Sequence, residues 1–548
     1  MLNLRSNKKF FVVFALLCLC VNLFVIWHLF GLRNGFHVDE IWSYAHSNSN
    51  NGPMIFGEKN QASWLPQEIF HDYLTVQKSD GFNFRHIYEN VKDDVHTPLY
   101  YMLFYTVNYF FDDAFSLWTG AGLNMGLWML SLMVMYTLSL KIFSNPFLAL
   151  APVVLYAFSI IGVSTVLFIR LYLLLTLILL CFVNASFSYM KEKEKYAHTA
   201  FKMFLFSFLA MLTSYTAIVF VFFFSLVFGC VLLFEKEYKK LAGLAVALFA
   251  GFAFFVAVWP YGILKIIEYN PVSFHENKDV LDVLEDIFSI YFLQLLGFRK
   301  DIHAHINIGY FCFYAVCFCY AFALNFYLGT FQRHKFVFFI SAVVFLTHIW
   351  LTFFMPDMFI YSGRYVMFLY PYIAIITIFL IYQIAVHFLP EKMSTLAMYG
   401  IVVLSICFVD YLRYCPYIFH QDEGEQKLMR ELEGKNLVAL ARTQYVLCDA
   451  SDVYLKAENV YLLPPYLYRY VTECDPANDM SEWPKIYADL KKGDYLLIFD
   501  QTFKGYFFDN NTPKRSPIKV CEDFESDLRF VDVIRIGNFY VDVYRIEK

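Results

Sequence analysis

The chain has 548 residues and a formal net charge of −5 at pH 7; 59% of its residues are hydrophobic, 20% are aromatic and only 17% are charged. A soluble protein carries about 25% charged residues, and several uncharged runs in this chain reach the roughly 20 residues that cross a bilayer. The composition therefore indicates a polytopic integral membrane protein, and the nearly balanced charge gives no reason to expect a nucleic-acid partner.

The first predicted helix runs from Phe10 to Phe30 and follows the basic residues Arg5, Lys8 and Lys9. The run is longer than the apolar region of a signal peptide and has no clear small-residue cleavage site, so we expect it to be retained as a membrane helix. Its basic flank predicts a cytoplasmic N-terminus.

A polar stretch, residues 33–96, comes next and contains the sequence HVDEIWSYAHS at 37–47. The following apolar segment, 97–111, has only 15 residues, which is short for a membrane span. If this segment crossed the bilayer, Arg170 and the later basic loops would have incompatible orientations. We therefore expect an interfacial or re-entrant helix on the outer side, starting near Thr97 and Pro98.

Uncharged runs further along the chain predict the remaining spans. One run, 203–234, is too long for a single ordinary span, and we expect two short crossings with a break at the sequence LTSYT, residues 212–216. The total comes to about eleven crossings, within a range of 11–13. The runs cover 115–140, 146–169, 171–190, 203–234, 241–264, 304–332, 336–356, 365–390 and 394–409.

Basic clusters at 191–195, 235–240 and 332–335 mark the cytoplasmic side under the positive-inside rule. We therefore expect the opposite, extracytoplasmic side to contain residues 33–96, Arg170, 265–302, 357–364 and everything after 410. Within 265–302, apolar residues recur at helical spacing over 280–297 and predict an amphipathic helix on the outer surface.

The tail, residues 415–548, is rich in charge and is expected to form a small α/β domain. Short apolar runs of strand length occur at 436–441, 460–464 and 495–500, and a period-two pattern around Gly537-Asn538 predicts a terminal hairpin. A helix pattern at 423–434 ends in glycine. Four cysteines lie in the tail, and one or two disulfides could form there in an oxidising compartment, with the pairing left open; they are Cys415, Cys448, Cys474 and Cys521.

Four polar features fall on the extracytoplasmic side of this topology. They are Asp39 with Glu40, the sequence DDVHTPLYY at 93–101, Arg170 with Tyr172, and the sequence SGRYVMF at 362–368, which contains Arg364 and Tyr365. Each alone has an ordinary explanation, such as a solvated acidic pair or an arginine that extends to the interface. However, an arginine at membrane depth costs roughly 2.5–3.5 kcal/mol, and residues 146–190 contain no other charge. Together the four features indicate one site with carboxylates opposite cations.

The residue types indicate what such a site could bind. Arginine guanidinium groups, together with His96, suit a phosphate because they form charge-assisted hydrogen bonds with its oxygens. A carboxylate beside them suits a general base for a hydroxyl group. An anionic lipid phosphate and a hydroxyl acceptor would use both halves of the site.

The order of these motifs resembles a known family. DE after the first helix, then D-x-H-x-P-L-Y-Y, then R-x-Y, then R-Y before a late helix is similar to the polyprenyl-phosphate-sugar glycosyltransferases of the GT-C fold, which include protein O-mannosyltransferases and the lipid A aminoarabinose transferase. The resemblance covers residues 1–412, and the tail matches the layout of the aminoarabinose transferase. It implies a GT-C transmembrane domain over 1–412 followed by an extracytoplasmic α/β domain over 415–548, in the plasma (inner) membrane.

The resemblance also implies residue roles. Asp39 would be the catalytic acid of the first loop, and Glu40 its partner, orienting the acceptor, the donor or a metal. No cofactor is implied as required, although Asp39, Glu40 and Asp94 could supply oxygen ligands to a divalent cation.

The remaining candidates are implied to bind the donor. Asp94, His96 and Tyr100 would line the donor site, Arg170 with Tyr172 would occupy the second catalytic region, and Arg364 with Tyr365 would hold the lipid phosphate. The chain departs from the family at two points: it has His96-Thr97-Pro98 where relatives often have His-Pro-Pro, and Thr213-Ser214-Tyr215 where they often have Thr-His-Tyr.

We therefore expect an inverting glycosyltransferase that moves a sugar from a polyprenyl-phosphate donor to a hydroxyl acceptor. Asp39 would deprotonate the hydroxyl, and Arg364, Arg170 and His96 would stabilise the departing phosphate. The acceptor, whether protein, glycolipid or cell-envelope glycan, and the sugar both stay open.

Three alternatives remain at this stage. A polysaccharide polymerase or ligase with a lipid-diphosphate donor would use similar arginines, but with a large outer loop late in the chain. A transporter or flippase would show charges or broken helices near the midplane of two similar halves, and the sequence has no internal repeat. The third alternative is an inactive scaffold that acts through its tail.

Overall fold

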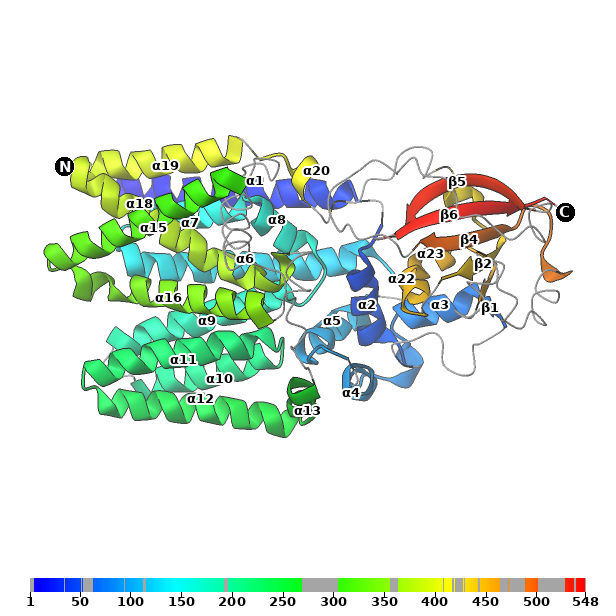
Figure 1. Cartoon of the computed structure of the whole chain (residues 1–548), viewed down its shortest axis with the longest axis horizontal. Coiled ribbons are helices and arrows are strands. Elements are labelled where there is room, and N and C mark those ends of the chain that lie inside the picture. The colour runs from blue at the N-terminus through cyan, green and yellow to red at the C-terminus, as the bar shows by residue number, and fades with distance from the viewer. Residues whose placement is uncertain are drawn as a thin grey trace.

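The structure is a computed structural model of the whole chain. It describes residues 4–33, 35–50, 52, 63–92, 94–111, 115–191, 196–268, 304–354, 363–407, 409–415, 418, 427, 429–441, 444–463, 472, 488–500, 528–536 and 539–547. Figure 1 shows an elongated molecule with a helical bundle at one end, a small sheet at the other and a group of short helices between them.

The bundle contains seven helical segments that, among the described residues, are long and apolar enough to cross a membrane. Its helices make the chain a multi-pass membrane protein. The seven are α1 (Leu4–Gly31), α6 (Leu117–Phe143), α9 (Tyr172–Lys191), α11 (Thr216–Phe234), α12 (Tyr238–Val258), α16 (Phe331–Phe354), and η3 (Gly363–Leu369) together with α18 (Tyr370–Phe388).

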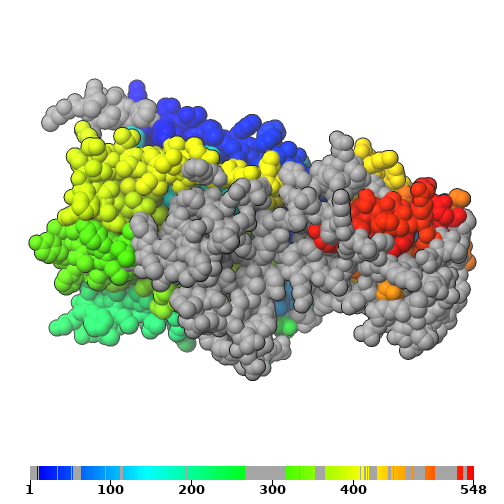
Figure 2. Space-filling view, turned by 45° about the horizontal axis from the view of Figure 1, so that its top comes forward, coloured from blue at the N-terminus to red at the C-terminus, as the bar shows by residue number. Residues whose placement is uncertain are grey.

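Three further helices lie where the sequence predicts spans and pack beside the seven. They are α10 (Tyr196–Met211), α15 (Ala304–Tyr327) and α19 (Glu391–Cys407). α10 ends at Met211 and α11 begins at Thr216, so the predicted break at LTSYT is confirmed. In Figure 2, α1 forms one edge of the bundle. Many of its exposed residues, such as Val13, Leu17 and Phe24, are apolar, as a lipid-facing surface requires.

The predicted single span at 146–169 is instead two helices, α7 (Pro146–Ala157) and α8 (Ile160–Leu167), which meet at an angle of 63°. Ser159 caps α8 by accepting a hydrogen bond from the Gly162 N–H at 3.0 Å, which is a typical helix start. A Cβ atom on Gly162 would lie 2.0 Å from the Tyr156 carbonyl oxygen. The bend therefore depends on a serine cap and on a glycine that permits close approach.

Short helices occupy the region between the bundle and the sheet (Figure 1). In chain order they are α2 (Val38–Asn48), α3 (Gln67–Leu74), η2 (Lys78–Asp80), α4 (Arg85–Lys92), α5 (Leu99–Phe110) and α13 (Tyr261–Glu268). α5 falls in the segment expected to lie at the interface. Its 12 residues extend about 18 Å, well short of the roughly 30 Å hydrocarbon core.

The tail contributes five strands to a six-stranded mixed sheet with strand order β1-β3-β2-β4-β6-β5. The predicted strands are confirmed as β2 (Asn436–Leu440), β3 (Asn459–Leu462) and β4 (Tyr495–Asp500), and the predicted hairpin as antiparallel β5 (Leu528–Ile536) and β6 (Phe539–Ile546). β2 and β3 are parallel and therefore need a crossover connection, which contains α22 (Gln444–Asp449) and α23 (Ser451–Tyr454).

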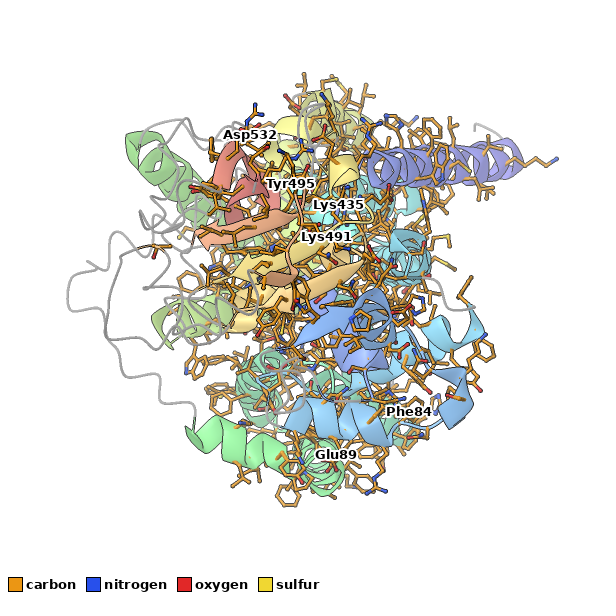
Figure 3. All side chains as sticks on the ribbon, turned by 90° about the vertical axis from the view of Figure 1, so that its right-hand side faces the viewer. Phe84, Glu89, Lys435, Lys491, Tyr495 and Asp532 are labelled. Atoms are coloured by element: carbon orange, nitrogen blue, oxygen red, sulfur yellow. The ribbon has the colours of Figure 1, made fainter. Side chains whose placement is uncertain are left out.

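One strand of this sheet comes from the first loop. β1 (Trp64–Pro66) pairs antiparallel with β3 at the sheet edge. The Trp64 indole N–H donates to Asp489 Oδ2 at 3.1 Å, and the Phe70 ring of α3 lies 5.1 Å from that of Tyr454. The segment that carries Asp39 is thus packed against the tail. Figure 3 views this end of the molecule, with Lys435, Lys491 and Tyr495 in the tail domain and Phe84 and Glu89 at α4.

Several predictions fall on other parts of the chain. The amphipathic helix at 280–297, Cys474 and Cys521 lie outside the described residues, as does most of the helix pattern at 423–434. Cys415, which follows the short helix α20 (Tyr411–Tyr414), and Cys448 are both buried.

Candidate active site

At the start of α2, the side chains of the neighbouring acids Asp39 and Glu40 have different partners. His37 is the N-cap. Its ring Nδ1 accepts a hydrogen bond from the backbone N–H of Asp39 at 3.1 Å, and its backbone N–H donates to Glu40 Oε2 at 2.8 Å. This reciprocal capping box turns the Glu40 side chain back to the helix start. The Asp39 side chain has different partners, so the neighbouring acids lie in different environments.

Asp39 forms an ion pair with Arg364, which lies at the start of η3. Its Oδ2 is also 3.5 Å from His37 Nδ1. Burial favours a raised pKa for Asp39, but the positive charge of Arg364 above all outweighs burial and holds the pKa below its ordinary value. Asp39 is therefore a carboxylate at neutral pH.

Arg364 also contacts aromatic residues. Its Nη2 donates to the Tyr365 hydroxyl at 3.2 Å, and its guanidinium carbon is 5.1 Å from the centre of the Tyr365 ring. The Tyr365 ring in turn meets that of Tyr172 edge-on at 6.0 Å. The structure thus brings the predicted residues Arg364, Tyr365 and Tyr172 together beside Asp39.

Arg170 lies in the turn between α8 and α9, and its side chain is almost completely buried. Nη1 donates to the Tyr101 hydroxyl at 3.1 Å and contacts Ser43 Oγ at 3.3 Å, and Nη2 lies 3.1 Å from His96 Nε2. Among the described residues no carboxylate forms an ion pair with Arg170, and its Nε has no acceptor. A buried, unpaired charge is costly, so this guanidinium is well suited to bind an anion.

His96 connects Arg170 with Asp94. Because a guanidinium can only donate, His96 Nε2 must accept from Arg170, and we assign the ring proton to Nδ1, which lies 2.6 Å from Asp94 Oδ2. Burial is the main cause that lowers the pKa of His96, with Asp94 opposing it. His96 is therefore neutral at pH 7. Asp94 also accepts from His46 Nε2 at 3.2 Å.

Glu40 does not share the surroundings of Asp39. Its carboxylate is fully buried against Arg33, and it also accepts the backbone N–H groups of His37 and Ile169. Among the described residues no three His, Cys, Asp or Glu side chains converge as metal ligands would. The structure thus does not bring Asp39, Glu40 and Asp94 together as a metal site.

The structure places Tyr101, rather than the predicted Tyr100, against Arg170. The Tyr100 ring is buried against Tyr101 and Phe104, whereas the Tyr101 hydroxyl contacts Arg170. Sequence reasoning singled out Tyr100 and missed Tyr101, although both occur in the motif. It also missed Arg33, because one basic residue after a membrane helix is typical of a topology signal.

Known proteins resemble this chain in structure rather than in sequence. No protein-family model matches the sequence, and no curated protein does. Solved structures do match. ArnT from Cupriavidus metallidurans in the apo state is 11% identical, with 97% of this chain and 98% of that chain covered and a TM-score of 0.53. The same protein bound to undecaprenyl phosphate is 10% identical, with 99% and 98% covered and a TM-score of 0.51.

A weaker match is the archaeal oligosaccharyltransferase AglB from Archaeoglobus fulgidus, in complex with an inhibitory peptide and a dolichol-phosphate. It is 8% identical, with 90% of this chain and 70% of that chain covered and a TM-score of 0.46. The chain has the GT-C fold of membrane glycosyltransferases, as the motif order suggested. The likeness to ArnT extends over the bundle, the short helices and the terminal sheet.

Proposed function

We propose that this protein is a glycosyltransferase that moves a sugar from a polyprenyl-phosphate donor to a hydroxyl acceptor. One observation carries the proposal: at one end of a GT-C bundle, the carboxylate of Asp39 is paired with Arg364, while Arg170 is a buried cation to which no described residue offers a carboxylate partner. This arrangement supports a general base at Asp39 and a phosphate site at the two arginines.

The two arginines suit the phosphate of the donor. The donor phosphate is a diester with two non-bridging oxygens, and it becomes a monoester with one more free oxygen and more negative charge when the sugar leaves. These oxygens accept from guanidinium N–H groups, and such charge-assisted bonds are short and strong. Arg170 gains the anion that its buried charge lacks. The ArnT structure bound to undecaprenyl phosphate shows that a protein of this fold takes a lipid of this class, which supports the same donor class here.

Asp39 would act as the base. When donor phosphate oxygens take up the Arg364 N–H groups, the Asp39 carboxylate is released to accept the proton of an acceptor hydroxyl. The hydroxyl oxygen attacks the anomeric carbon from the side opposite the phosphate, and the carbon–oxygen bond to the phosphate breaks. Polyprenyl phosphate departs with the electron pair, stabilised by Arg364 and Arg170, and the anomeric configuration inverts.

His96 has a role different from the one the sequence suggested. Both of its ring nitrogens are engaged, one by Asp94 and the other by Arg170, so it orients Arg170 and contributes no N–H to the phosphate. The proposed reaction requires no metal, because the positive charge that would stabilise the leaving phosphate comes from the two arginines.

We place the reaction on the extracytoplasmic side. The turn between α11 and α12 lies at the bundle end away from the sheet (Figure 1), and Glu235 in this turn forms an ion pair with Lys335. Two of the basic clusters that predict the cytoplasmic side therefore share that end. The site and the tail occupy the other one.

The test is transfer by the purified protein in lipid nanodiscs. Undecaprenyl-phosphate sugars would be supplied with candidate acceptors, and release of undecaprenyl phosphate would be measured by mass spectrometry. We expect release that depends on the acceptor and is lost in Asp39→Asn. Release from undecaprenyl-diphosphate donors only would favour the polymerase or ligase alternative, and lipid movement without bond cleavage would favour a flippase.

A further inference from the structure

The turn that carries Arg170 is held in place, together with the last two residues of α8, by side chains of other elements; these residues, 166–170, are called the turn below. Asn124 of α6 donates to the carbonyls of Val166 at 2.9 Å and Phe168 at 2.8 Å. The Leu167 carbonyl accepts from Arg33 at 2.6 Å, and the Ile169 carbonyl accepts from Ser43 Oγ at 3.0 Å. Four consecutive carbonyls, from the C-terminal end of α8 into the turn after it, thus have side-chain donors, which they need because they are shielded from water.

Arg33 and Glu40 form the centre of this arrangement. Their side chains are both 0% exposed, and the guanidinium meets the carboxylate through both of its Nη atoms. Glu40 Oε1 also accepts the Ile169 N–H at 2.8 Å. The ion pair therefore binds the turn on two sides, through the carbonyl of Leu167 and the N–H of Ile169.

The residues that make these contacts are adjacent in the sequence to the residues proposed to act on the substrates. Glu40 is adjacent to Asp39, and Ile169 is adjacent to Arg170. We propose that Arg33 and Glu40 are positioning residues that fix the Asp39 carboxylate relative to the Arg170 guanidinium. This inference rests on the proposed function, because it assigns to Asp39 and Arg170 the base and the phosphate site.

The opposite side of the turn is equally constrained. A Cβ atom on Gly120 of α6 would lie 2.5 Å from Ile169 Cγ2, so α6 approaches the turn as closely as a glycine allows. Ile169 is thus confined between α6 and the Glu40 carboxylate. A change at the ion pair would therefore alter the position of the turn, and of Arg170 with it.

The energetics favour positioning over stability as the reason for the ion pair. The cost of removing two charges from water often exceeds their mutual attraction, so an apolar pair of similar size can be as stable. A base and a phosphate site, in contrast, must be held closely in position: a misplacement of about 1 Å can cost about 100-fold in rate.

The experiment follows from this difference. The double variant Arg33→Met/Glu40→Met removes both charges and leaves neither one buried alone. We expect it to fold, to bind undecaprenyl phosphate within about threefold of the wild type, and to lose about 30- to 100-fold in kcat. The matched control is Glu235→Met/Lys335→Met, which removes an ion pair at the far end of the bundle and should leave kcat unchanged.

Arg33→Lys keeps the charge opposite Glu40 but loses the fork that also reaches Leu167, so it tests the idea even if the double variant fails to fold. We expect its kcat to fall about tenfold with little change in donor binding. Wild-type kcat in either folded variant would overturn the positioning role. A wild type without transfer in the same assay would overturn the proposed function instead, so the two failures are distinguishable.

Discussion

The carboxylate of Asp39 and the guanidinium of Arg364 form an ion pair although 325 positions separate them in the chain. The Asp39 side chain is 20% exposed and that of Arg364 is 15% exposed, so both retain access to a ligand. A phosphate oxygen bound at Arg364 would compete with Asp39 for the same N–H groups. Donor binding and release of the base are therefore coupled in the proposed reaction.

Arg364→Lys should weaken donor binding more than it slows chemistry. Lysine keeps one positive charge but lacks the planar fork that can contact two phosphate oxygens at once. We expect the KM for the donor to rise about tenfold, which corresponds to about 1.4 kcal/mol, with a smaller change in kcat. Steady-state kinetics at several donor concentrations would measure both values. Arg85→Lys, on the exposed start of α4, is the control, and an unchanged KM in Arg364→Lys would contradict the phosphate assignment.

Asp39→Asn should abolish transfer and preserve donor binding. The amide cannot accept the acceptor proton, and a general base contributes about 100- to 10,000-fold to the rate. Because Arg364 is released from its carboxylate, undecaprenyl phosphate should bind at least as tightly as to the wild type. Turnover and lipid binding are measured on the same preparation, with Asp72→Asn on the exposed face of α3 as the control. Activity close to that of the wild type would rule out Asp39 as the base.

The pH profile should report the protonation of His96. A proton on Nε2 would place two donors, His96 and Arg170, against each other, so activity should fall as His96 becomes charged. Burial, the largest cause, and the charge of Arg170 lower the pKa of His96 from 6.5, whereas Asp94 raises it. The acid limb of kcat/KM is therefore expected below pH 6.5. The pKa of Asp39 is below its ordinary value of 3.8, so Asp39 does not titrate in the pH range in which His96 does.

Asp94→Asn tests the sign of this effect. Asparagine retains an oxygen for the Nδ1–H of His96 but removes the negative charge that raises its pKa, so the pKa of His96 should fall further. The acid limb should then move to lower pH, as measured by kcat/KM between pH 4.5 and 8. A limb that moves to higher pH, or one that persists in His96→Asn, would show that another group titrates.

The sequence predicted the part of this site in which charge is unusual. Arg170 stands alone in a long apolar region, and Asp39 and Arg364 flank membrane helices, so the cost of burying charge made them conspicuous. Sequence reasoning could not tell that Glu40 faces Arg33 while Asp39 faces Arg364, because that depends on the capping geometry of α2. It equally could not tell Tyr101 from Tyr100.

Among the elements of the fold, too, some were predictable from the sequence and others were not. The strands of the tail have clear apolar patterns and were predicted, whereas β1, with only three residues, has no pattern of its own and exists because β3 offers an edge. The bend between α7 and α8 did have a signal, Ser159 followed three residues later by Gly162. It was outweighed by an uninterrupted apolar run of the length of a membrane span.

The packing of the tail on the first loop should be essential for stability. Phe70 is 0% exposed, lies against Tyr454 of α23 and follows β1 at the sheet edge, so Phe70→Ala leaves a cavity between the two segments. Deleting a buried phenylalanine side chain costs roughly 3–5 kcal/mol. We expect a lower melting temperature and faster tryptic cleavage within residues 415–548, measured by thermal unfolding and timed proteolysis. Phe110→Ala is the matched control, since that ring is 76% exposed and should be removable at little cost. Equal cleavage rates for the two variants would show that the tail is held by other contacts, and that the first loop does not depend on the tail for its position beside Arg170.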